Sequence, residues 1–202
     1  MQPNYDLDDS EIPIPIDNDL QQRIHDIFMA HDSIGNKTVD AETLGIIIRS
    51  LGLFPSNAEV AVIVNKTQKK DEPGVIHLVD FLPYIEEEIN QGKFKPKSLE
   101  EILQAFRTLD QDNYGFLDKE QLSAFMTKYA EPFDEDEMAE MLEMSFNNFT
   151  KKIHYEEIVK KLKYQPKGEK DIFVLAERVK RERPQPVEEK KRTISQMFSV
   201  NQ

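Results

Sequence analysis

The stretch SLEEILQAFRTLDQDNYGFLDKEQLSAFM, from Ser98 to Met126, predicts a helix, a twelve-residue loop and a second helix. Ser98 is a favourable N-cap, and Glu101 three residues later completes the capping-box pattern. Apolar residues then recur at helical spacing as far as Leu109. The first helix is therefore expected to bury one face.

The loop from Asp110 to Gln121 follows the EF-hand pattern, with alternating oxygen donors and glycine at the sixth place. The candidate calcium ligands are Asp110, Asp112, the carbonyl of Phe116, Asp118 and Gln121. A calcium loop normally closes with a bidentate carboxylate, whereas Gln121 offers one good oxygen and no charge. Tyr114 at the fifth place is too long to replace a short donor. We expect weak calcium binding or none, and no required cofactor.

Three other segments repeat this unit, and each has lost several ligands. Their loops run over residues 32–43, 69–80 and 146–157. Lys37 and Lys151 stand at the sixth place of the first and last loops, where glycine is usual. None of these three loops is expected to bind calcium.

A branched apolar residue is kept at the eighth place of every loop. These residues are Val39, Ile76, Leu117 and Ile153. Paired EF-hands join their loops by a short antiparallel pairing at this place, which such side chains favour. The sequence predicts an all-α protein with four degenerate EF-hands in two lobes and extended N-terminal and C-terminal tails.

Composition excludes several classes of protein. The 202 residues include no cysteine, and the net charge of −12 argues against nucleic-acid binding. The sequence has neither a signal peptide nor a membrane span, which predicts a soluble intracellular protein without a membrane partner. No nucleophile motif or phosphate loop is present, so an enzyme is not expected.

The predicted domains are an acidic extended tail, two lobes with a linker between them, and a basic tail. In chain order they cover residues 1–18, 19–91, 92–97, 98–163 and 164–202. The linker is either a hinge or the end of a bent helix. In the basic tail, residues 171–183 form a short amphipathic helix that must dock or fray. From Gln165 onward the net charge is +3, which suggests a separate partner, although a solvated tail is equally consistent.

Methionines of the second lobe are candidates for a groove that holds a partner's amphipathic helix, since thioethers adapt to varied surfaces. The candidate partner-binding residues are Met126, Met138, Met141, Leu142 and Met144. The alternative is that they fill the lobe core. For Phe106 and Phe125 we expect core packing.

The chain resembles calmodulin and its relatives over residues 28–52, 105–127 and 153–159. It is more closely similar to the calmodulin-like subunit-eight family of the nexin–dynein regulatory complex, also called EF-hand calcium-binding domain-containing protein two. The segments that carry this likeness are residues 46–60, 81–96 and 115–142, including the turn Glu131-Pro132-Phe133.

This resemblance implies a non-catalytic subunit of the link between outer doublet microtubules in the axoneme of a cilium or flagellum. Such a subunit would bind helices of other regulatory-complex subunits and help to regulate dynein-driven motility. One alternative is a weak calcium sensor acting through the third loop, and another is a regulatory subunit of a soluble enzyme. From its charge, the basic tail is also expected to contact tubulin or neighbouring axonemal proteins.

Overall fold

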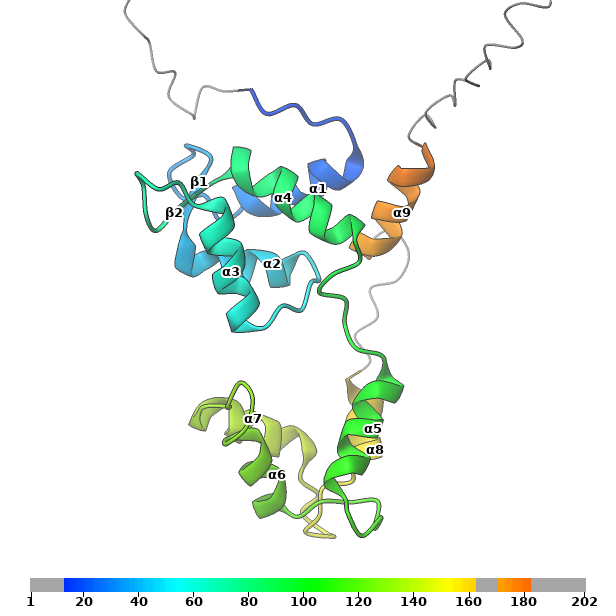
Figure 1. The fold of residues 1–202 in the computed structure, drawn as a ribbon. Coiled ribbons are helices and arrows are strands. Elements are labelled where there is room, and N and C mark those ends of the chain that lie inside the picture. The colour runs from blue at the N-terminus through cyan, green and yellow to red at the C-terminus, as the bar shows by residue number, and fades with distance from the viewer. Residues whose placement is uncertain (1–12, 163–170, 183–202) are drawn as a thin grey trace, which may run out of the picture.

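The computed structural model describes residues 13–162 and 171–182, which form two helical lobes and a further helix (Figure 1). The N-lobe, residues 19–90, contains α1 (Asp19–Met29), β1 (Thr38–Asp40), the 3-10 turn η1 (Ala41–Thr43), α2 (Leu44–Ser50), α3 (Asn57–Thr67), β2 (Val75–His77) and α4 (Leu78–Asn90). The C-lobe, residues 98–162, contains α5 (Leu99–Leu109), α6 (Lys119–Met126), α7 (Glu135–Ser145) and α8 (Tyr155–Lys161), and α9 (Ile172–Glu182) follows. The predicted all-α, two-lobe class is confirmed. Predictions for residues 1–12, 163–170 and 183–202 lie outside the described residues.

Local signals start several helices. The capping box predicted at Ser98 is present, and the sequence pattern of a capping box is likewise fulfilled at Ser56 and Asp134. At the start of α5, the Ser98 hydroxyl accepts the backbone N–H of Glu101 at 3.2 Å, and the Glu101 carboxylate accepts that of Ser98 at 2.8 Å. These bonds satisfy donors that have no partner within the helix, and so fix where the helix begins.

The loops pair as the eighth-place residues predict. Val39 on β1 faces Ile76 on β2 in an antiparallel pair. In the C-lobe, Leu117 and Ile153 exchange two backbone hydrogen bonds of 2.9 Å. All four side chains are buried, so each lobe closes around its paired loops.

The sharp turn of the EF-hand loop is kept even where its glycine is lost. Gly74 and Gly115 have φ of 89° and 81°, and the lysines at the same place of the other two loops also have positive φ. Lys37 has φ of 62° and Lys151 of 56°. Because this conformation is unfavourable for residues with a Cβ, the surrounding structure must impose it.

The connection between the lobes is a turn rather than one continuous bent helix. α4 ends at Asn90, Gly92 has φ of 73°, and α5 begins at Leu99. A second contact between the lobes joins the Glu131 carboxylate to the backbone N–H of Asn57 at the start of α3. A carboxylate at a helix N-terminus is favoured by the helix dipole.

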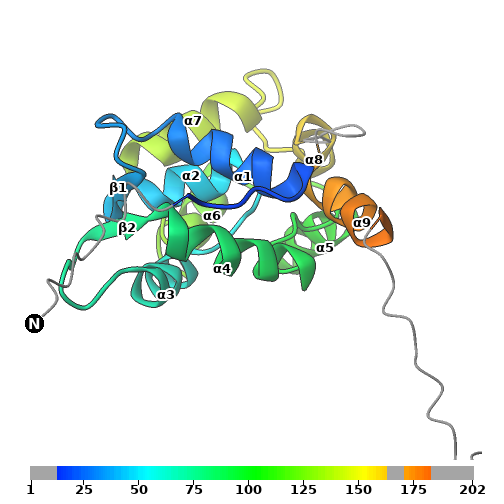
Figure 2. The ribbon, with the colours of Figure 1, turned by 90° about the horizontal axis from the view of Figure 1, so that it is seen from above.

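The N-lobe core extends beyond its four EF-hand helices. The rings of Phe28 and Phe81 lie at its centre, 5.5 Å apart. α9 packs against α1 and α4 and buries its apolar face in the same core (Figure 2). The segment before α1 also contributes, since Ile14 and Ile16 are partly buried against the N-lobe core. None of the helices in the described part of the chain has both the length and the hydropathy that a membrane crossing requires.

Candidate functional site

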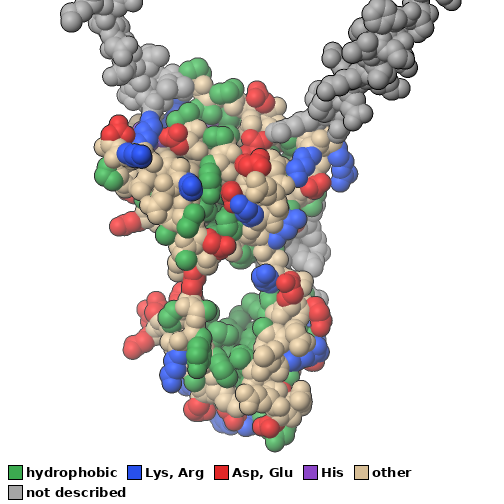
Figure 3. Space-filling model, viewed as in Figure 1, with side chains coloured by type: hydrophobic (Ala, Val, Ile, Leu, Met, Phe, Trp, Pro, Cys, Tyr) green, Lys and Arg blue, Asp and Glu red, His purple; other side chains and the backbone are tan. Residues whose placement is uncertain are grey.

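The C-lobe contains an apolar groove with a volume of about 510 Å³. It is lined by Lys97, Glu101, Ile102, Ala105, Phe106, Leu109, Met126, Phe133, Met141 and Leu162. Half of these residues come from α5 and Lys97 precedes it, while the others come from α6, α7, the Phe133 turn and the end of α8. In Figure 3, hydrophobic side chains gather in the middle of this lower lobe. The groove has the shape and chemistry that accept the apolar face of a helix.

The five predicted partner-binding residues fall in different places. Met126 and Met141 line the groove. Met138 is buried in the C-lobe core, and with Leu142 it lines a separate hollow against Phe133. Met144 is 37% exposed and lies outside both sets of lining residues.

The two phenylalanines expected in the core also differ. Phe106 is buried, and its ring stacks on Tyr155 with centroids 5.8 Å apart. Phe125 is half-buried, with its ring 6.1 Å from Tyr129. Phe106 thus serves both the core and the floor of the groove.

The groove lies in an acidic lobe. Residues 98–162 carry fifteen acidic and seven basic side chains, a net charge of −8. α7 contributes three acidic residues in its first turn and has no basic residue in its last. On the groove wall, Lys97 and Glu101 lie 3.8 Å apart. This field favours a partner with net positive charge.

In the third loop, protein groups surround the first calcium-ligand position. The Asp110 carboxylate is buried and accepts the backbone N–H groups of Tyr114 at 3.0 Å and Gly115 at 2.7 Å. It also accepts the Tyr155 hydroxyl at 2.9 Å. Burial by itself raises the pKa of this carboxyl, but the hydrogen bonds from Gly115, Tyr114 and Tyr155 outweigh it and hold the pKa below its ordinary value. Burial, reinforced by the bond to the carboxylate, raises the pKa of Tyr155.

The lowered pKa of Asp110 predicts acid sensitivity. Its stabilising contribution is complete above the ordinary pKa of 3.8 and is lost as the pH falls through the lower folded-state value. Tyr155→Phe removes one hydrogen bond to the carboxylate, so we expect the folded-state pKa of Asp110 to rise toward its ordinary value. The stabilising contribution should then be smaller, and its loss should be complete at a higher pH. Carboxyl NMR titration and thermal unfolding between about pH 2 and pH 6 measure both effects. Asp112→Asn, which changes an exposed carboxylate, is the control. If Tyr155→Phe leaves the titration of Asp110 unchanged, the Tyr155 hydroxyl does not lower the pKa of this carboxyl.

Two further predicted ligands, Asp118 and Gln121, make contacts within the protein. Asp118 forms an ion pair of 2.5 Å with Lys152 of the fourth loop. The Gln121 side-chain oxygen accepts the backbone N–H of Asp118 at 2.9 Å as part of a capping box. Asp112 is exposed, and Phe116 is half-buried. Over residues 13–162 and 171–182, no three acidic or histidine side chains converge as a metal-binding group.

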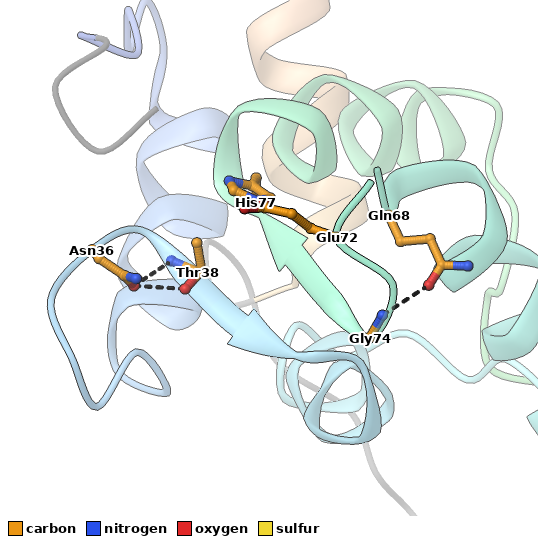
Figure 4. A network of polar contacts seen from close by, with 6 residues as sticks. All are labelled: Asn36, Thr38, Gln68, Glu72, Gly74 and His77. Atoms are coloured by element: carbon orange, nitrogen blue, oxygen red, sulfur yellow. Dashed lines mark hydrogen bonds and ion pairs between the residues drawn. The ribbon is translucent and has the colours of Figure 1, made fainter. Parts of the chain in front are cut away.

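The N-lobe loops are likewise held by contacts within the protein (Figure 4). Asn36 accepts the Thr38 hydroxyl at 2.6 Å, and His77 lies 2.5 Å from the Glu72 carboxylate. The backbone N–H of Gly74 donates to the Gln68 side chain at 3.3 Å. These contacts connect residues of the two N-lobe loops to their neighbouring turns and strands.

Comparison with known proteins identifies the family. Residues 99–163 match the family model described as an EF-hand domain pair. Over 141 residues the chain is 32% identical to dynein regulatory complex protein 8 of Mus musculus, a match that covers 70% of this chain and 86% of that protein. The chain belongs to the family of dynein regulatory complex protein 8. It is also 33% identical over 110 residues to the Homo sapiens protein of that name, covering 54% of this chain and 41% of the human one. It therefore spans less than half the length of this relative.

This member of the dynein regulatory complex protein 8 family has a fold similar to a myosin light-chain structure. The Physarum polycephalum myosin II regulatory domain matches with a TM-score of 0.55 and 26% identity, over 70% of this chain and 93% of that chain. The family is of the calmodulin type, which is typically non-catalytic, and an EF-hand pair is compatible with calcium binding.

Two residues of the third-loop site, Lys152 and Tyr155, do not belong to the calcium-loop pattern that the sequence predicts for residues 110–121. A signal for the first was present, because antiparallel pairing of Leu117 with Ile153 places Asp118 opposite Lys152. No comparable signal placed the Tyr155 hydroxyl on Asp110, which lies 45 residues away in the chain.

Proposed function

We propose that this chain is a non-catalytic structural subunit of the nexin–dynein regulatory complex in the axoneme, where its C-lobe groove holds a helix of a neighbouring subunit. The family relationship supports the assembly, since 86% of the mouse protein is covered at 32% identity. The groove supports the mode of binding. It is an apolar groove in an acidic lobe, which suits a basic amphipathic helix.

The contacts in the third loop favour a fixed subunit over a calcium sensor. A sensor loop needs free ligands that a cation can draw together. Here Lys152 already neutralises Asp118, and Tyr155 together with backbone N–H groups already satisfies Asp110. A weak calcium sensor remains the second candidate function, because Asp110, Asp112 and Asp118 are all retained. Calcium titration separates these two functions.

A variant with a blocked groove tests the proposed assembly. Ala105 is exposed on the groove wall, so Ala105→Glu places a charge in the apolar channel without changing the lobe core. In cells that build motile cilia, the tagged wild-type chain is expected to stay with detergent- and salt-extracted axonemes. The Ala105→Glu chain is expected to shift to the soluble fraction.

Gln104→Glu is the matched control, because it adds the same charge to an exposed neighbour that does not line the groove. It should behave as the wild type. Equal retention of Ala105→Glu would refute the groove as the attachment site, and a wild-type chain found only in the soluble fraction would refute the axonemal assignment. Contact of the basic tail with tubulin stays a prediction, since most of that tail lies outside the described residues.

A further inference from the structure

α9 lies on the N-lobe as a bound helix would. Four apolar residues, at the first, fourth, fifth and eighth positions of the helix, are buried: Ile172, Leu175, Ala176 and Val179. They join the N-lobe core against α1 and α4. The opposite face is open, with Val174 half exposed. This one-sided burial is the pattern by which a groove holds an amphipathic helix.

Polar contacts fix the position of α9. Arg178 forms an ion pair of 2.5 Å with Asp19 at the start of α1. The Lys180 ammonium donates to the carbonyl of Asn90, the last residue of α4, at 2.7 Å. A cation at this point satisfies a helix-end carbonyl and complements the helix dipole. Both contacts come from basic residues on the docked helix.

The repeat allows the two lobes to be compared position by position. Ile24 stands eight residues before the first loop, and Ile102 stands eight before the third. Ile85 follows its loop's closing residue by five, as Leu162 does in the C-lobe. Ile24 and Ile85 have no exposed surface, whereas Ile102 is half-buried and Leu162 is 39% exposed.

The difference between these matched positions follows from α9. It covers α1 and α4 in the N-lobe, while their counterparts α5 and α8 line the open groove of the C-lobe. The C-lobe groove is therefore the unfilled equivalent of the place where α9 lies.

Charge explains why α9 selects the N-lobe. Asp19, the partner of Arg178, stands thirteen residues before the first loop. The corresponding residue of the C-lobe is Lys97, which lines the groove. If α9 lay in the C-lobe groove in the same orientation, Arg178 would face Lys97 instead of an acidic residue. Repulsion between the two positive charges disfavours that arrangement.

We propose that α9 is a built-in ligand that closes the N-lobe groove, so that the chain binds a partner through the C-lobe groove alone. The expected partner is a net basic amphipathic helix with apolar residues at the spacing of α9. The C-lobe part rests on the proposed function; the α9 part stands independently. The chain would then hold one helix per molecule, with one lobe filled internally and the other available.

Binding stoichiometry tests this arrangement in the full chain. The first probe is a helical peptide of leucine and lysine, LKKLLKLLKKLLKL, and the second is a peptide of residues 171–182. Calorimetry should give one leucine–lysine peptide per wild-type chain, with affinity at least about tenfold lower in Ala105→Glu. Ala176→Asp places a charge in the α9 interface and should raise the stoichiometry to two. Val174→Asp, on the open face of the same helix, should leave it at one.

The second peptide distinguishes a folded variant with a vacant N-lobe groove from a variant that has lost its fold. The peptide of residues 171–182 should bind once to the Ala176→Asp chain and not to the wild type, because only the variant has a vacant N-lobe groove. Failure to bind the variant would overturn the assignment of α9 as ligand. So would two leucine–lysine peptides on the wild type, or the same number of peptides on the wild type and on Ala176→Asp.

The result also separates this inference from the proposed function. If the wild-type chain binds no leucine–lysine peptide while Ala176→Asp binds one, then α9 closes the N-lobe as inferred but the C-lobe groove is not a helix site. If both chains bind one peptide, and Ala105→Glu abolishes it, the C-lobe site stands and the role of α9 is refuted. No binding to either chain refutes both.

Discussion

Phe28→Ala is expected to lower the free energy of unfolding of the N-lobe by about 3–5 kcal/mol. Phe28 has no exposed surface, and its ring packs against that of Phe81, 5.5 Å away. The substitution removes most of a large apolar side chain and leaves a cavity at the point where α1 and α4 meet. Because α9 packs on the same two helices, its docking should weaken at the same time.

Hydrogen exchange measured on peptides of the intact chain reports this loss separately for each lobe. Amides of α1, α4 and α9 should exchange faster, and those of α5 to α8 should keep their rates. Ile34→Ala is the control in the same lobe, since Ile34 is 79% exposed and should change stability by less than about 0.5 kcal/mol. A change below about 1 kcal/mol in Phe28→Ala would show that this ring is not the centre of the core.

Gln121→Glu combined with Lys152→Gln is expected to raise the calcium affinity of the third loop by about a hundredfold or more. Gln121→Glu supplies the missing bidentate carboxylate, and Lys152→Gln removes the ammonium group 2.5 Å from Asp118. Ligand number and ligand charge both rise, and these two quantities set the affinity of such loops. Calcium calorimetry in millimolar magnesium measures the change.

The matched control replaces Lys151 instead of Lys152 in the Gln121→Glu chain. Lys151 has the same charge and lies beside the Phe146 ring, 6.0 Å from its centroid. This control should show only the gain that Gln121→Glu provides. Asp110→Ala should abolish binding in every background. Micromolar binding by the wild-type chain that disappears in Asp110→Ala would instead favour the calcium-sensor function.

The sequence by itself determined the features that depend on neighbouring residues. The helix starts at Ser56, Ser98 and Asp134 follow from bonds that span three residues. The pairing of Leu117 with Ile153 follows from the loop repeat, because each loop places its eighth residue at the same point. The loss of a closing carboxylate at Gln121 was likewise visible in the sequence alone.

The docking position of α9 and the identity of the open groove required the tertiary structure. An amphipathic pattern shows that a helix has an apolar face, but it does not show which lobe receives that face. The choice depends on a contact between Arg178 and Asp19, which lie 159 residues apart, and on the lysine at position 97 that replaces this acid in the other lobe. Such contacts arise only when the chain has folded, since they join groups that no local pattern relates.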